Sequence, residues 1–223
     1  MAIPGLPGVS VTKLVDRVQQ MLEATEMLAR SDVLVGVPSN KANRRPLPGK
    51  KPEPITNASL AYIHEFGSPA RNIPARPFLF PAIRKIKPQV RALMKKAAQD
   101  ALKGDKGAVK RVLNEVGLLA QIAAQAAITD PEPPFVPLKP ATIRARLRRT
   151  QAGRRQLARL QQNAKAAGLS TSQVLLDWGA SPTLSGNTNI QPLIDTGQLR
   201  QSLRYVVREN LSGAAMTITR RVP

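Results

Sequence analysis

The sequence predicts an α+β fold, in which several helices accompany a few short strands. Apolar residues recur with helical spacing, most clearly over residues 11–29 and 105–128. Short runs rich in β-branched residues lie at 32–38 and near the end of the chain, at 205–208 and 214–220. With 223 residues and 42% hydrophobic content, the chain is long enough to bury one ordinary core, so we expect a single domain over its whole length, 1–223.

The first part of the chain reads as helix, strand, basic loop and short helix. Ser10 can cap the first helix, and the run from Asp32 to Pro38 predicts a buried strand that glycine and proline stop. The segment 39–55 is basic, rich in proline and without an apolar pattern, so we expect a projecting loop, with a solvated, disordered loop as the alternative. Asn57 can cap the next helix, and Gly67 suits its left-handed C-terminal cap.

Four prolines between residues 69 and 81 predict a stiff, extended connector after this short helix. The connector displays Arg71 and Arg76, and it offers Phe78 and Phe80 as anchors. Rigid display of this kind suits a contact with another protein.

The two longest helices are expected in the middle of the chain. One starts near Pro88, where proline favours a new start or a kink, and it stops at Gly104. Asp105 can cap the other, whose apolar stripe extends towards Ile128 and makes it the main core helix. A proline-rich connector over 131–140 follows.

The C-terminal part combines a basic helical stretch with a final hairpin. From Pro133 to Leu176 there are nine basic residues and no acidic one. We expect a basic helical insertion or arm over 148–190. Asp195 or Thr196 can then cap a short helix before the strand at Tyr205, and a hairpin ends the chain.

Composition narrows the classes of function. The 34 Lys and Arg against 14 Asp and Glu give a net charge of +20, which favours polyanionic or acidic partners and association that weakens with salt. The chain has no cysteine, which excludes a disulfide framework, a thiolate zinc site and a cysteine nucleophile. We find no secretory leader and no window near the roughly 20 apolar residues of a spanning helix, so we expect no membrane partner and a cytoplasm-like setting.

The pair His64 and Glu65 could belong to a catalytic helix, but the residue count argues against it. A zinc-protease helix needs a second histidine one turn away, and His64 is the only histidine in the chain. The carboxylates are scattered, no G-x-S-x-G elbow marks a serine nucleophile, and no glycine pattern suits a phosphate cradle. We expect no enzyme, cofactor or metal site; an Asp/Glu metal enzyme is the minor alternative.

The basic stretch suggests a second function, which is contact with a nucleic-acid backbone. Eight of its cations could line phosphates: Arg144, Arg146, Arg148, Arg149, Arg154, Arg155, Arg159 and Lys165. No aromatic residue lies inside this run, so bases have no stacking platform, and any DNA contact would be independent of sequence. A solvated arm, or one that docks on an acidic protein, is the alternative.

Five segments together carry a resemblance to a known group of proteins: LVGVPSN, ITNASLAYIHEFGSP, NIPARPFLFPAI, LKPATIRARL and PLIDTGQLRQSLRYVV. In this order they resemble the tail-completion, neck or virion-morphogenesis proteins of tailed bacteriophages. The Asn-Ala…Glu-Phe-Gly helix, the Ile-Pro-Ala-Arg-Pro-Phe turn and the Asp-Thr-Gly-x-Leu element are specific as a set. The stretch from about Arg148 to Leu184 is longer than is usual in this group and is interpreted as an insertion.

The resemblance implies a small, mainly antiparallel sheet flanked by helices, with long extended loops. It implies a homo-oligomeric ring that joins the DNA-filled head to the tail or caps the tail tube, located in the virion after assembly in the cytoplasm of a bacterial host. The implied partners are further copies of this chain, connector or portal-side and tail-tube proteins, and packaged DNA without sequence specificity. The candidate assembly residues, which fix either the monomer's own packing or a contact with a neighbouring subunit, are Arg71, Arg76, Phe78, Phe80, Arg44, Arg45, Lys50 and Lys51.

Overall fold

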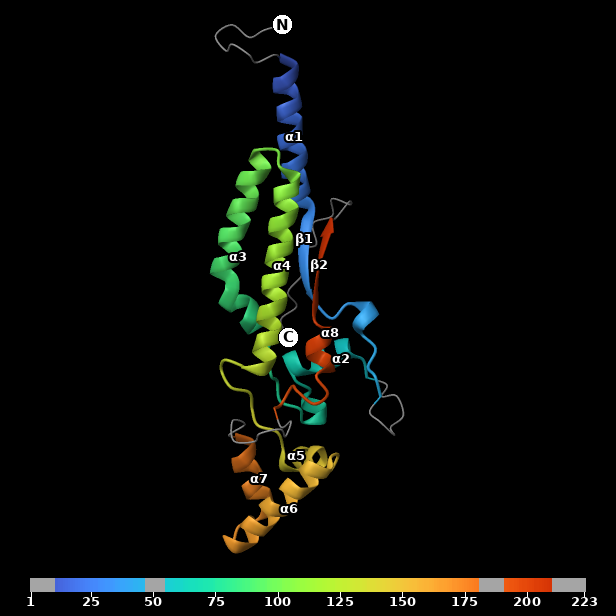
Figure 1. Cartoon of the computed structure of the whole chain (residues 1–223), viewed down its shortest axis with the longest axis vertical. Coiled ribbons are helices and arrows are strands. Elements are labelled where there is room, and N and C mark those ends of the chain that lie inside the picture. The colour runs from blue at the N-terminus through green and yellow to red at the C-terminus, as the bar shows by residue number, and fades with distance from the viewer. Residues whose placement is uncertain (1–10, 47–54, 181–190, 210–223) are drawn as a thin grey trace. The chain divides into compact units, whose positions relative to one another are not determined.

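The chain consists of two compact units in the computed structural model, which describes residues 11–46, 55–180 and 191–209. Unit 1 comprises the chain up to Val35, residues Lys85–Gln121 and the chain from Tyr205 onward, and unit 2 comprises Gly36–Arg84 and Ile122–Arg204. The described ranges are mainly helical and contain a two-stranded antiparallel sheet, which confirms the α+β prediction (Figure 1). Each unit has its own core and is described by itself.

Unit 1 is built from a helix, a strand pair and parts of two long helices. Its elements are α1 (Val11–Arg30), β1 (Ser31–Gly36), β2 (Arg204–Glu209) and the unit 1 portions of α3 (Leu79–Leu102) and α4 (Lys106–Thr129). Helices α3 and α4 form a hairpin with α1 beside it (Figure 1). Its buried centre consists of Ala24, Ala101, Val109 and Leu113. At the hairpin turn Gly104 has φ 81°, and the side chain of Asp105 accepts the Ala108 N–H at 2.8 Å, so both predicted signals are confirmed.

Helix α3 starts at Leu79, and the prediction that it starts near Pro88 is therefore wrong. Pro81 lies in the first turn, where backbone N–H groups have no acceptor within the helix, so its missing donor costs nothing there. Pro88 lies inside the helix and removes one hydrogen bond. The helix continues because Ile86 and Ala97, on either side of this proline, are buried.

Helix α4 is long and apolar enough, by length and composition, to cross a membrane, which the sequence analysis does not expect of any segment. Part of its apolar surface is buried: Val109 and Leu113 belong to the core of unit 1, and Ala124 and Ile128 belong to a core of unit 2, whereas Leu118 and Ile122 are exposed. Burial within the chain's own cores therefore accounts for a part of this composition, since 39% of the apolar window is buried.

Unit 2 contains two clusters of buried residues and most of the short helices. Its elements are η1 (Ser39–Lys41), α2 (Asn57–Phe66), η2 (Pro69–Arg71), α5 (Pro140–Leu147), α6 (Gln151–Ala166), α7 (Thr171–Ala180) and α8 (Gln198–Ser202). One core cluster is Phe78, Ala124, Ile128, Leu193, Leu199 and Leu203. Helices α5, α6 and α7 pack on one another around the other cluster, which is Leu138, Ile143, Leu147, Leu157 and Leu175 (Figure 1).

The basic insertion predicted over 148–190 is helical as far as Ala180, and the remaining residues, 181–190, lie outside the described part of the chain. It shares its core with α5, which precedes the predicted boundary. The end of the loop, 47–54, and the predicted last strand, 214–220, also lie outside the described residues.

Two predicted helix caps are wrong, namely Asn57 for α2 and Asp195 or Thr196 for α8. Helix α2 is capped by Thr56, whose hydroxyl accepts the Ser59 N–H at 3.0 Å, while the side-chain amide of Asn57 donates to the carbonyl of Lys41 at 3.2 Å. Helix α8 follows Gly197, which has a left-handed conformation and makes no side-chain cap.

Candidate functional site

The carboxylate of Glu65 caps the start of α3. Its buried carboxylate accepts the backbone N–H groups of Phe78 at 2.9 Å, Leu79 at 3.0 Å and Phe80 at 3.0 Å. These N–H groups belong to the first turn of α3 and the residue before it, where helices have unsatisfied donors and favour negative charge. Glu65 therefore ties α2 to the start of α3.

Arg76 fixes the proline-rich connector from inside. It is only 5% exposed, and its guanidinium donates to the carbonyls of Val136 at 3.0 Å and Pro137 at 3.2 Å. Its backbone N–H donates to the carbonyl of His64 at 2.7 Å. Phe78 is buried in the core of unit 2. Of the two roles expected for the connector, Arg76 and Phe78 serve the monomer's own packing.

Phe80 points the other way and forms an exposed aromatic cluster with Tyr62 and Phe66. The ring centroids are 4.8 Å apart for Tyr62 and Phe66, and 6.0 Å apart for Phe66 and Phe80. Tyr62 is 66% exposed, Phe66 55% and Phe80 58%. Because Glu65 holds α2 against the start of α3, the aromatic cluster is a preformed apolar surface. Its signal in the sequence is the i,i+4 spacing of Tyr62 and Phe66 on one helix.

His64 is neutral at physiological pH, which follows from its surroundings. Burial lowers its pKa to about 4, and the charges of Arg76, Arg146 and Arg44 act in the same direction. Its Nδ1 atom is buried and has no hydrogen-bond partner within the described structure. The described residues contain no group of three or more potential metal ligands around it or elsewhere.

A cavity of about 200 Å³ lies beside His64 in unit 2. Arg44, Arg146 and Asp195 bring charge to its wall, and Leu60 and Leu199 bring apolar surface. Arg44 donates to the side chain of Asn57 at 3.4 Å, and Arg146 and Asp195 are engaged with each other.

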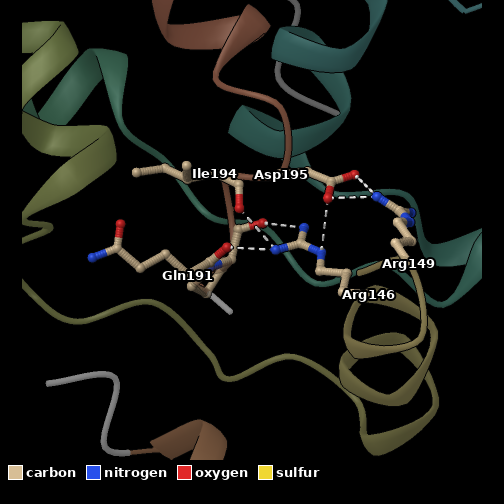
Figure 2. A network of polar contacts seen from close by, with 6 residues as sticks. Arg146, Arg149, Gln191, Ile194 and Asp195 are labelled. Atoms are coloured by element: carbon tan, nitrogen blue, oxygen red, sulfur yellow. Dashed lines mark hydrogen bonds and ion pairs between the residues drawn. The ribbon is translucent and has the colours of Figure 1, made fainter. Parts of the chain in front are cut away.

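Arg146 organises the segment before α8, as Figure 2 shows. Its guanidinium donates to the carbonyls of Gln191 at 2.8 Å, Ile194 at 2.9 Å and Pro192 at 3.3 Å. Asp195 lies 3.6 Å from its Nε and accepts from Arg149 at 2.6 and 2.7 Å. Asp195 is therefore a partner of two arginines, and it does not cap α8, whose N-cap residue is Gly197.

The eight cations of the basic stretch thus divide into two groups. Arg146 and Arg149 hold this network, and Arg144 is half-buried, with its Nε buried and lacking a partner in the described structure. The other five are exposed: Arg148, Arg154, Arg155, Arg159 and Lys165.

The remaining assembly candidates contribute unequally. Arg71 is exposed on the connector. Arg45 is exposed as well, and its backbone N–H and carbonyl pair with the side chain of Gln198 at 2.7 and 3.0 Å. Lys50 and Lys51 lie outside the described residues.

A second exposed apolar surface lies on α1 and is not among the predicted sites. Leu14, Val15, Val18 and Leu22 are all exposed and fall within one sector of the helix about 100° wide; we call them the α1 stripe. The core of unit 1 uses another side of α1, which includes Ala24. Apolar periodicity predicts the helix but does not tell its buried side from its exposed side.

A short segment of the chain is similar to a known archaeal protein. No protein-family model matches the chain, and no solved structure matches it. An uncharacterized protein of Methanocaldococcus jannaschii, MJ0331, is 43% identical over 42 residues. The match covers 19% of this chain and 31% of that protein, so this chain spans less than a third of the relative.

Proposed function

We propose that this chain is a structural subunit of the head-tail junction of tailed bacteriophages, which assembles as a ring that joins the DNA-filled head to the tail or caps the tail tube. The proposal begins from the five sequence segments that resemble neck and tail-completion proteins. It places the chain in the virion, after assembly in the cytoplasm of a bacterial host.

The observation that carries an assembly role is the exposed aromatic cluster of Tyr62, Phe66 and Phe80. Exposed aromatic side chains on a rigid support are the usual anchors of protein interfaces, because they bury much area and lose little conformational freedom. The support is rigid here because Glu65 binds three backbone N–H groups at the start of α3. In the segment that resembles the phage proteins, the buried side chains therefore stabilise the fold, and the exposed aromatic side chains are available to a partner.

A ring needs two different surfaces on each subunit, because a head-to-tail contact joins one patch to another patch of the next copy. The exposed apolar residues of the described chain include two such groups, the aromatic cluster in unit 2 and the α1 stripe in unit 1. Both are available to other copies of the chain or to connector and tail-tube proteins.

The alternative function is that of a separate, sequence-independent DNA-binding protein. The observation in its favour is the group of five exposed cations around α6. A junction subunit also meets packaged DNA, so DNA contact is compatible with the structural role, whereas the aromatic cluster has no use in binding a phosphate backbone.

The assembly role is tested by the double substitution Phe66→Ser and Phe80→Ser in the full chain, with Leu169→Ser as an exposed apolar control outside the cluster. Analytical ultracentrifugation and native mass spectrometry measure association. We expect wild type and control to form one closed oligomer and the double variant to associate at least roughly tenfold more weakly, with an unchanged unfolding midpoint. A wild-type chain that stays monomeric at high concentration, or a double variant that assembles as well as wild type, contradicts the proposal.

A further inference from the structure

Helix α6 has a buried side and an outer side of unusual chemistry. Gly153, Leu157 and Ala164 are buried against α5 and α7. The exposed positions of α6 carry cations, side-chain amides and three small alanines, Ala152, Ala158 and Ala166, and none of the large exposed apolar residues of the described chain lies on this helix. An ordinary solvated helix alternates charges of both signs, whereas α6 has no acidic residue.

The exposed cations of α6 are not needed for the ion pairs with Asp195 in unit 2, because arginines that precede α6 form those pairs. Arg146 and Arg149 are engaged by Asp195 and by backbone carbonyls. Arg155, Arg159 and Lys165 are exposed, and Arg154 makes one bond, from a terminal nitrogen to the carbonyl of Arg148 at 3.1 Å.

The electrostatic field around α6 is opposed by few acidic groups. The described residues of unit 2 carry seventeen Lys and Arg against five Asp and Glu, while those of unit 1 carry thirteen against eight. Two of the five acidic residues in unit 2 already have partners within the chain, since Glu65 accepts from backbone N–H groups and Asp195 pairs with two arginines. A polyanion is therefore attracted most strongly to unit 2.

The chemistry of this surface distinguishes between an acidic protein and a nucleic acid. Protein interfaces use arginine as well, but they are anchored at their centre by apolar and aromatic residues, and the outer side of α6 has no large apolar or aromatic residue. A phosphate backbone is bound by long cations and side-chain amides, and Gln151, Gln161 and Gln162 stand exposed among the arginines. Arg154 and Lys165 are eleven residues apart, so they span about 16 Å, or roughly five phosphates of one strand.

We propose that the outer side of α6, formed by Arg154, Arg155, Arg159 and Lys165 with the adjacent Arg148, binds the phosphate backbone of double-stranded DNA without sequence preference. The duplex is favoured over a single strand because α6 has no aromatic side chain on which unpaired bases could stack. The inference goes beyond the proposed junction role and does not depend on it, since it concerns the isolated chain.

The test measures binding of the purified full chain to a short duplex of arbitrary sequence by fluorescence anisotropy over a series of salt concentrations. The α6 variant carries R154Q, R155Q, R159Q and K165Q. The control removes the same charge from exposed positions of α3 with K87Q, R91Q, K95Q and K96Q. Each lost phosphate contact lowers the magnitude of the slope of log K against log salt by about 0.9. We therefore expect the α6 variant to lose roughly three to four units of slope and the control less than about one.

A third variant, R154K with R155K and R159K, changes the same arginines but keeps their charges. It separates the loss of charge from a defect in folding as the cause of weaker binding. It should retain the wild-type slope, because a phosphate backbone accepts lysine as a point charge. The inference is overturned if the α6 variant and the control lose equal slope, if the lysine variant binds as weakly as the glutamine variant, or if a single strand or polyglutamate binds more tightly than the duplex.

Discussion

Glu65 joins helix α2 to the first turn of α3 through its side chain alone. A carboxylate at this position satisfies three donors that a helix start leaves open, and it is charged where the helix dipole favours negative charge. Glutamine keeps one acceptor but loses the charge and turns an amide group towards other donors. We predict that Glu65→Gln lowers the free energy of unfolding by about 1–3 kcal/mol, measured by urea denaturation. The exposed Glu115→Gln should change it by less than about 0.5 kcal/mol, and equal effects at both positions contradict this role.

His64 predicts a pH dependence of stability. Its pKa is about 4 in the folded chain, against 6.5 for the unperturbed side chain, so the unfolded state binds more protons between these values. The free energy of unfolding therefore falls as the pH is lowered through this window, with up to about 3 kcal/mol due to this residue.

The measurement compares wild type with His64→Gln by denaturation near pH 7 and near pH 5. Wild type should lose about 2 kcal/mol more than the variant over this interval. The same loss in both proteins contradicts a buried, neutral histidine.

At the scale of single residues, the sequence predicts which residues matter better than it predicts what they do. Glu65, Arg76 and Phe78 stand in the quoted motifs, but their use in capping and in holding carbonyls depends on chain segments far away in sequence. Arg146 looks like its neighbours in a basic run, and only the position of the carbonyls of 191–194 separates it from the exposed arginines. Local patterns contain no information on such distant partners.

At the scale of elements, the contact of β2 with α4 depends on a glycine. The ring of Tyr205 lies over Gly117, and a Cβ at that position would overlap the ring. The backbone N–H of Tyr205 donates to the side chain of Gln121 at 3.1 Å, and its hydroxyl lies 3.3 Å from the side-chain oxygen of Asn114, so the ring is held in place.

We predict that Gly117→Ala lowers the free energy of unfolding by about 1–3 kcal/mol, although alanine favours helix, because Tyr205 must move. Thermal and urea denaturation measure the change. Gly36→Ala, where no atom lies within 4 Å of the added Cβ, serves as the control and should stay within about 0.5 kcal/mol. Stabilisation by Gly117→Ala would show that the ring does not pack on this glycine.

Helices and strands were predictable wherever the spacing of apolar residues agrees with the capping and turn residues at the ends of the element. The first helix, the turn at Gly104 with its Asp105 cap, and the strand near Tyr205 all have local signals and are confirmed. The predicted start of α3 was wrong because Pro88 was interpreted as a helix start, whereas it lies inside the helix. The helix begins earlier, where Pro81 in the first turn costs no hydrogen bond and Glu65 provides the cap. The α1 stripe was missed because apolar spacing does not say which side of a helix is covered.

At the scale of the whole molecule, charge and apolar surface are distributed over different places. The aromatic cluster and the α1 stripe are exposed and apolar, and we propose them for protein contacts, whereas the outer side of α6 is exposed and basic, and we propose it for contact with DNA. Composition alone gives the net charge of +20 but not this separation of surfaces. It does not distinguish the arginines that bind Asp195 and backbone carbonyls from the arginines that stay exposed. A subunit at the junction of a DNA-filled head and a protein tail has a use for both kinds of surface.

The most direct test of the junction role is electron microscopy of particles made by a tailed phage that carries this gene, after its deletion and with the gene resupplied in trans. We predict filled heads separate from tails, or tails of abnormal length, in the deletion, with rescue by the wild-type gene and not by the gene with Phe66→Ser and Phe80→Ser. Intact, infectious virions in the absence of the gene would contradict the account.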